Sequence, residues 1–291
     1  MIKITIKNRN RYFSFFLLSF LLVFYLFSPV LAWGAEPTTA VQLVKYETNK
    51  KTVTGEKRVD YRWMEANLPV YGDGKTFYYH QGPVFEGDKW DPGRAKNLKN
   101  KGAVKGTALK DLCKLVGGMS PGDEVVIFAS DGYQVKLDYQ NIYEPPDRQG
   151  PVVLCWYNGE EEKAGEQQGN GYVPSYYTGM RLVFMSKVPN AEGKYVFGNA
   201  DMRDCMKKEK YWHFYEGKYP STSGLSAKWV EEIAIFSGGA PEKPFRLTTK
   251  ETGKKSQFPP SDYTFMDMIP YIVCFLILLL AGVYFFNRPK K

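Results

Sequence analysis

The sequence predicts a strand-rich α+β domain followed by one C-terminal transmembrane helix, and three observations lead to that fold class. Aromatic residues make up 16% of the chain, which also contains 27 glycines and 18 prolines, and this composition favours strands and turns over a helical bundle. Short apolar or alternating runs, bounded by turn residues, recur between residues 124 and 236. Near the C-terminus, residues 268–286 contain no charged side chain.

The strands are predicted from these runs. Residues 124–129 are continuously apolar after Glu124, and residues 133–139 alternate between apolar and polar side chains, which indicates one face in water. Asp131-Gly132 between them is a strong turn signal, as is Asn158-Gly159 after a later strand. Further strands are expected at 151–157, 180–185, 194–197 and 228–236, and residues 40–44 are expected to form an edge strand.

Helices are predicted in two places. Thr107 is a good N-cap, apolar residues repeat at helical spacing from Leu109 to Val116, and Gly117-Gly118 follows. Residues 201–208 are expected to form a short helix. By contrast, residues 60–90 mix aromatic residues with glycine and proline, which predicts turns and short strands, and residues 160–170 form a polar insertion.

Residues 1–35 have the order of a secretory signal. Four basic residues and no acidic residue precede a long apolar run at 12–28, and small residues near Ala32 and Ala35 offer cleavage sites. The length of the apolar run leaves an uncleaved signal anchor as the alternative.

Residues 267–287 are predicted to span a membrane. At a rise of about 1.5 Å per residue, the uncharged run nearly crosses a hydrocarbon core of about 30 Å. The basic tail at 288–291 predicts a cytoplasmic C-terminus, with the domain on the other side of the cell membrane. Residues 237–266, rich in glycine, proline and lysine, are interpreted as a stalk linker. A buried core helix is the alternative for the apolar run, but it would need a polar face.

The net charge of +8 does not indicate a nucleic-acid partner. Seven of the 39 basic residues and one of the 31 acidic residues flank the two apolar segments. The remaining 32 basic and 30 acidic residues give a net charge of +2. The basicity therefore reflects membrane topology, and the partner expected from it is the membrane itself.

Four cysteines are present, and Cys274 lies in the predicted membrane helix. Cys113, Cys155 and Cys205 would be extracytoplasmic, where a disulfide among them is possible and no bond at all is the alternative. The helical spacing places Cys113 on the apolar face with Leu109, which indicates a core residue.

The two histidines of the chain, His80 and His213, each lie in a dense aromatic cluster, at residues 78–83 and 211–215. One interpretation is a shared pocket for a cofactor, a metal or a small anion, with Cys205 and His213 as metal ligands close to Asp201 and Met202. The alternative is that both clusters pack the core and that backbone groups satisfy the imidazoles.

One stretch resembles a known family. Residues 106–112, followed by Gly117-Gly118, Gly122-Asp123 and the Ser130-Asp131-Gly132-Tyr133 segment, resemble the molybdopterin-binding domain of sulfite oxidase-type oxidoreductases. Three later strands, at 152–159, 179–183 and 227–233, resemble strands of that family in the same order. The match covers residues 103–236 in patches and leaves residues 36–102 as an aromatic and glycine-rich N-terminal part. The resemblance implies the strand-rich mixed fold of that family and a molybdopterin cofactor. Asp131 and Tyr133 of the motif, together with His80 and His213 of the aromatic clusters, are the candidate cofactor-binding residues.

The chain departs from the family in three ways. The family's molybdenum ligand is a cysteine before the helix, and this chain has no cysteine before Cys113. Its N-terminus lacks the paired arginines of a twin-arginine signal, and no cluster of basic residues for a pterin phosphate is visible. We therefore expect a relative that has kept the fold and lost the molybdenum chemistry.

Two function classes remain. One is a divergent, membrane-anchored oxidoreductase relative that uses a separate redox protein as its electron partner. The other is a non-enzymatic surface module that binds a small ligand, a metal or a protein partner through its aromatic loops. Asp131 and Tyr133 are candidate site residues in both classes. The alternative is a purely structural role, because Asp-Gly is first of all a turn sequence.

Overall fold

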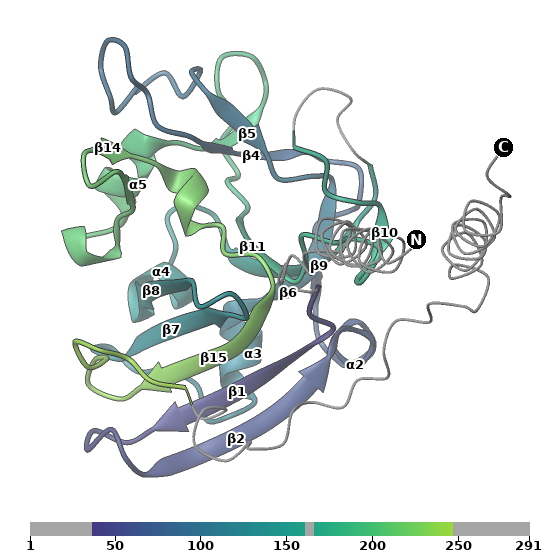
Figure 1. Ribbon diagram of the computed structural model, residues 1–291, viewed down its shortest axis with the longest axis vertical. Helices are drawn as coiled ribbons and strands as arrows, with labels where there is room; N and C mark the ends of the chain where they lie inside the picture. The colour runs from purple at the N-terminus through teal and green to yellow at the C-terminus, as the bar shows by residue number, and fades with distance from the viewer. Residues whose placement is uncertain (1–36, 161–165, 247–291) are drawn as a thin grey trace, which may run out of the picture. The chain divides into compact units, whose positions relative to one another are not determined.

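The computed structural model describes residues 37–160 and 166–246 (Figure 1). The predicted signal at 1–35, residues 247–266 of the stalk, the span at 267–287 with Cys274, and the tail at 288–291 lie outside the described residues. Within the described ranges, none of the helices combines the length and the apolar composition that crossing a bilayer requires.

The largest sheet has the strand order β2-β1-β15-β7-β8. Its strands are β1 (Ala40–Tyr46), β2 (Val53–Asp60), β7 (Glu124–Ala129), β8 (Gln134–Asp138) and β15 (Val230–Phe236). The sheet is mixed, because β1 and β15 are parallel while the other pairs are antiparallel. The predicted strand at 124–129 is confirmed, and every residue of β7 is buried. In β8 the buried residues alternate with more exposed ones, as expected for a strand with one face in water.

The prediction of an edge strand at residues 40–44 is wrong. β1 lies inside the sheet, between β2 and β15, with Leu43 opposite Ile233. The edge is β2, whose side chains alternate between exposed and partly buried. Local sequence could not show this, since the partner strand on one side of β1 comes from the far end of the domain.

A second sheet has the order β10-β9-β6-β3, with β11 also paired to β9. It consists of β3 (Val70–Tyr71), β6 (Val104–Ala108), β9 (Val152–Asn158), β10 (Gly171–Tyr172) and β11 (Arg181–Phe184). A third sheet joins β4 (Tyr78–Gln81), β5 (Leu98–Asn100) and β12 (Tyr195–Phe197), and β13 (Phe214–Tyr215) pairs with β14 (Tyr219–Pro220). Strands from residues 40–100 therefore pair with strands from the family-like segment 103–236.

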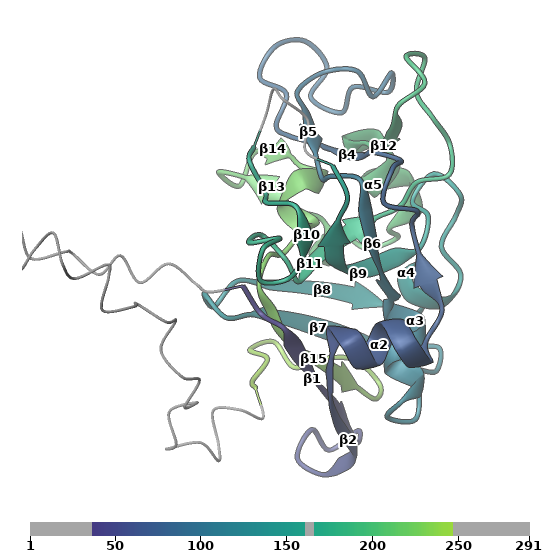
Figure 2. The ribbon, with the colours of Figure 1, turned by 90° about the vertical axis from the view of Figure 1, so that its right-hand side faces the viewer.

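The helices of the described residues are few and short. They are α2 (Tyr61–Asn67), α3 (Leu109–Lys114), α4 (Tyr139–Tyr143) and α5 (Asn199–Cys205), with 3-10 turns η1 (Glu209–Tyr211) and η2 (Thr222–Leu225). Figure 2 shows α2, α3 and α4 on one side of the sheets. The described part of the chain is thus a strand-rich α+β domain.

Two helix predictions need correction. Residues 60–90 were expected to lack a helix, yet α2 forms there, with the Asp60 carboxylate accepting a hydrogen bond from the Trp63 N–H at 2.8 Å. Helix α3 begins at Leu109, and Thr107 is not its cap. Thr107 instead pairs with Leu154 in the sheet, and its hydroxyl accepts a hydrogen bond from Trp156 Nε1 at 3.2 Å. Pairing with β9 outweighs the local capping preference of Thr107.

One hydrophobic core joins the two larger sheets. Leu109, Leu112 and Cys113 of α3 are buried, as their spacing predicted, against β6 and β9. Trp156 is fully buried on β9, and Ile233 contributes from the largest sheet. β4 and β5 lie at the opposite end of the domain from β1 and β2 (Figure 1).

Candidate functional site

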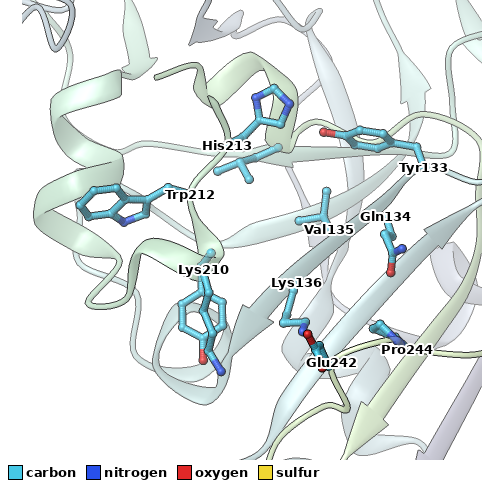
Figure 3. Close-up of a pocket in the computed structure, with 11 residues that line it drawn as sticks. Tyr133, Gln134, Val135, Lys136, Lys210, Trp212, His213, Glu242 and Pro244 are labelled. Atoms are coloured by element: carbon cyan, nitrogen blue, oxygen red, sulfur yellow. The ribbon is translucent and has the colours of Figure 1, made fainter. Parts of the chain in front are cut away.

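A cleft of about 230 Å³ opens between β8 and the segment that carries His213 (Figure 3). Four chain segments contribute to it: the start of β8, residues 210–213, the end of η2, and the loop after β15. The lining residues are Tyr133, Gln134, Val135, Lys136, Lys210, Tyr211, Trp212, His213, Leu225, Glu242 and Pro244.

The Glu124 carboxylate fixes one wall of the cleft. Its Oε1 accepts hydrogen bonds from the Tyr211 hydroxyl at 2.5 Å and from Lys210, and its Oε2 accepts one from the Ala240 N–H at 3.0 Å. Burial raises the pKa of Glu124, but the hydrogen bonds from Lys210 and Tyr211 outweigh it and lower the pKa below its usual value. Burial and the same carboxylate raise the pKa of Tyr211. Glu124 therefore stays ionised and ties residues 210–211 to the loop at Ala240.

Tyr133 and His213 lie together at the other end of the cleft. Their ring centroids are 6.3 Å apart, and the Tyr133 hydroxyl donates to the Gly224 carbonyl at 2.7 Å. The His213 ring packs on the Cα of Gly224, where an added Cβ would lie 2.1 Å from His213 Nδ1. Only glycine leaves room for the imidazole in this position.

Both rings are neutral at pH 7. Burial lowers the pKa of His213 and raises the pKa of Tyr133. His213 Nδ1 is buried without a hydrogen-bond partner. The imidazole thus lacks the carboxylate neighbour that orients a general base in a catalytic triad, and the Tyr133 hydroxyl is held as a hydrogen-bond donor.

The other two candidate cofactor-binding residues lie elsewhere. Asp131 is exposed in the turn between β7 and β8, where its Oδ1 accepts from the Tyr133 N–H at 2.9 Å, so its contacts are those of a turn residue. His80 is fully buried on β4, and its Nε2 accepts from the Phe184 N–H at 3.0 Å. Its ring packs edge-on against Phe184 and Phe197. In the described part of the chain, neither a hydrogen bond nor a ring contact joins the two imidazoles.

The cysteines of the described residues were candidates for a disulfide or a metal site, and all three are buried. Cys113, Cys155 and Cys205 are buried free thiols, so the structure contains no disulfide among them. Burial raises the pKa of Cys113 to about 12 and that of Cys205 to about 11. Residues 37–160 and 166–246 contain no group of three or more histidine, cysteine, aspartate or glutamate side chains placed to hold a metal ion, so Cys205 and His213 do not assemble one there.

These thiols also test the molybdopterin implied by the resemblance. A thiolate ligand needs an accessible sulfur with a low pKa, and burial raises the pKa of Cys155 as well. The described donor set therefore does not fit a molybdenum centre held by a cysteine.

Sequence reasoning found two of the cleft residues, Tyr133 and His213, and missed the charged ones. Lys136 was visible only as a polar position of an alternating strand, and Lys210 and Glu242 carried no local signal. Trp212 was noted as a neighbour of His213 and does line the cleft.

No protein-family model matches the chain, and no curated protein matches it.

Proposed function

We propose that this chain is a membrane-anchored, extracytoplasmic binding module for a small zwitterion with a planar ring. The cleft carries the proposal, because it gathers aromatic side chains at one end and side chains of both charge signs at the other (Figure 3). Its volume of about 230 Å³ is below the range of roughly 300–1,000 Å³ typical of sites for drug-sized ligands, which favours a ligand of amino-acid size.

The charges of the cleft support a zwitterion over a simple anion. Lys210 is bonded to Glu124, so its charge is largely compensated. Lys136 and Glu242 both line the cleft, and no salt bridge joins these two described residues. A ligand carboxylate fits Lys136, and a ligand ammonium fits Glu242.

The aromatic end supports a planar group. Tyr133 and His213 present rings there, and ring pairs gain about 0.5–1.5 kcal/mol beyond the area that they bury. The protonation states favour binding over acid–base catalysis, since Tyr133 holds its proton in a hydrogen bond and His213 is a neutral imidazole without an orienting partner.

Calorimetric titration of the purified full chain tests this proposal. Tryptophan and phenylalanine are expected to bind, while benzoate and benzylamine, which each lack one charge, bind about tenfold more weakly, since about 1.4 kcal/mol corresponds to a factor of ten. Lys136→Met and Glu242→Gln should each weaken binding of the amino acids to a similar degree. Lys187→Met removes an exposed lysine paired with Asp147 and serves as the control. Equal binding by both cleft variants and the control would overturn the proposal, as would failure of all four compounds to bind.

We further infer that the fold is of the sulfite oxidase type and that its molybdenum chemistry has been lost. The order of the family-like motifs along β6, α3, β7 and β8 supports the first part. The buried thiols with raised pKa support the second. Near-stoichiometric molybdenum in natively purified protein would contradict the loss.

The proposed location rests on the apolar segments and their charges. A signal at 1–35 and a span at 267–287 with a basic tail would place residues 36–266 outside the cell membrane. A surface protein, or a separate redox protein in the divergent-oxidoreductase alternative, is the partner class that this location allows. Protease added to intact cells should remove the domain and leave the C-terminal tail protected.

A further inference from the structure

Two cationic side chains are buried in the interior, and neither lines the cleft. Lys101 follows β5 and is 1% exposed, and Arg181 begins β11 and is 2% exposed. The two positive charges lie close enough that Arg181 lowers the pKa of Lys101, after burial, which is the larger cause.

The hydrogen-bond partners of this pair are neutral. Lys101 Nζ donates to Ser223 Oγ at 2.8 Å. Arg181 donates to Ser226 Oγ and to Gln168 Oε1, both at 2.8 Å. Ser223 lies within η2 and Ser226 directly follows it, so one short turn supplies a hydroxyl to each cation.

Among the described residues, one carboxylate, that of Glu166, approaches this pair from the surface. Its Oε2 is 3.6 Å from Arg181 Nη2, and its Oε1 accepts a hydrogen bond from Lys228. The Glu166 side chain is 42% exposed. In the described part of the chain, no carboxylate forms a salt bridge with Lys101. In the described part of the chain, one partly exposed carboxylate thus faces three cations, two of which are buried.

Such an arrangement leaves positive charge in the interior. A buried ammonium without a partner costs several kcal/mol unless it loses its proton or gains a counter-ion. Deprotonation can relieve only the lysine, because the arginine guanidinium stays charged in proteins. His80 lies near the same two charges, and burial together with these charges lowers its pKa well below the usual value, so the imidazole is neutral and supplies no counter-charge.

We propose that Lys101, Arg181 and Ser223 form a binding site for one small monovalent anion of the size of chloride. The ammonium has N–H donors beyond the one given to Ser223, and the serine hydroxyl, which accepts from the lysine, has its own proton to donate. The near-complete exclusion of both cations from solvent favours a monatomic ion over a larger metabolite.

The Glu166 carboxylate competes with this anion for Arg181. It is the carboxylate nearest to Arg181, and its exposure allows it to turn toward solvent when an anion enters. Removing its charge should therefore strengthen anion binding, although the same substitution removes a favourable neighbour of Arg181.

Thermal unfolding of the full chain tests the site. Sodium chloride or bromide replaces sodium gluconate at constant ionic strength, since gluconate is too bulky to enter. The Tm of the unaltered protein should rise with the logarithm of the halide concentration, because a ligand that binds only the folded state stabilises it. Lys101→Met should abolish this rise, and Glu166→Gln should move it to several-fold lower halide concentration.

Lys99→Met is the matched control, since Lys99 is an exposed lysine two residues away on β5. It should respond to halide as the unaltered protein does. The same halide response in Lys101→Met and the unaltered protein, or none in either, would overturn the proposal. A crystal grown in bromide provides a direct measurement: anomalous density between Lys101 and Arg181 is expected, and its absence at a bromide concentration that saturates the Tm would overturn the site independently of the cleft.

Discussion

Two buried cationic regions of this domain differ in the position of the carboxylate that faces them. At the first, Arg94 donates to the carbonyls of Val188 and Pro189 at 2.9 Å, and Asp201 lies 3.7 Å away in the interior. At the second, Lys101 and Arg181 donate to hydroxyls and an amide, while their carboxylate, Glu166, sits at the surface. The carboxylate of the first region is buried, and the carboxylate of the second region is partly exposed at the surface.

This difference separates a structural ion pair from a candidate ligand site. Asp201 has no exposed side-chain surface, and it also accepts from the Gly198 N–H at 2.8 Å and from Arg148 at 2.5 Å. Burial raises the pKa of Asp201 and outweighs these donors, so the carboxylate is costly but fully bonded. Buried cations with such a partner have no need for an external anion. Buried cations without a buried carboxylate keep a positive electrostatic potential around them, which can bind an anion from solution.

The largest expected effect comes from removing the central carboxylate. Asp201→Asn leaves Arg94 buried without its anion, and the free energy of unfolding should fall by about 3 kcal/mol. Denaturant titration measures it. Asp204→Asn on the same helix removes only an exposed partner of Arg203 and should change stability by less than about 1 kcal/mol. Similar losses in the two variants would remove the distinction between the regions.

A smaller effect of opposite sign is expected at the second region. In gluconate, Lys101→Met replaces a buried charge without a carboxylate by an apolar chain of similar length. The free energy of unfolding should rise by about 1 kcal/mol, because replacing buried ions by well-packed apolar groups is often stabilising. Chloride should shrink this gain, since only the unaltered protein binds the ion. Denaturant titration in both salts checks it, and a loss of stability in gluconate would show that Lys101 is satisfied as it stands.

The last effect concerns pH. Burial, followed by the charges of Lys101 and Arg181, lowers the pKa of His80 well below its usual value. The unfolded chain then binds more protons below about pH 6.5, so stability is constant above that pH and falls as the pH decreases, by at most about 1.4 kcal/mol per unit and per histidine.

His80→Gln should flatten this fall between pH 6.5 and 5, leaving the part due to His213, whose pKa is also lowered by burial. Unfolding curves at several pH values provide the measurement. An unchanged slope in the variant would mean that His80 does not titrate with unfolding.

Several elements were predictable because their signals are local. The alternation in β8 and the apolar run of β7 follow from side chains that point to opposite faces of a strand, or from burial of both faces. The buried face of α3 follows from helical spacing. Errors arose where a distant partner decided the outcome: β1 gains β15 as a neighbour, and Thr107 joins a strand opposite Leu154.

The candidate site divides in the same way. Aromatic clusters marked His213 as a candidate, and the motif segment marked Tyr133. One interpretation of the sequence paired His213 with His80, whereas the fold pairs it with Tyr133, because η2 and β8 meet at the cleft. The charged residues that give the cleft its character come from three segments with no common pattern.

The sequence by itself determined the strand-rich α+β class, most strand positions and the apolar segments at both ends, because periodicity and composition are properties of neighbouring residues. Only the tertiary structure decided which strands pair, which rings share the cleft, and where charge is left unbalanced. Lys101 and Ser223 are 122 residues apart in the chain and still share a hydrogen bond. Burial and charge compensation depend on such distant contacts.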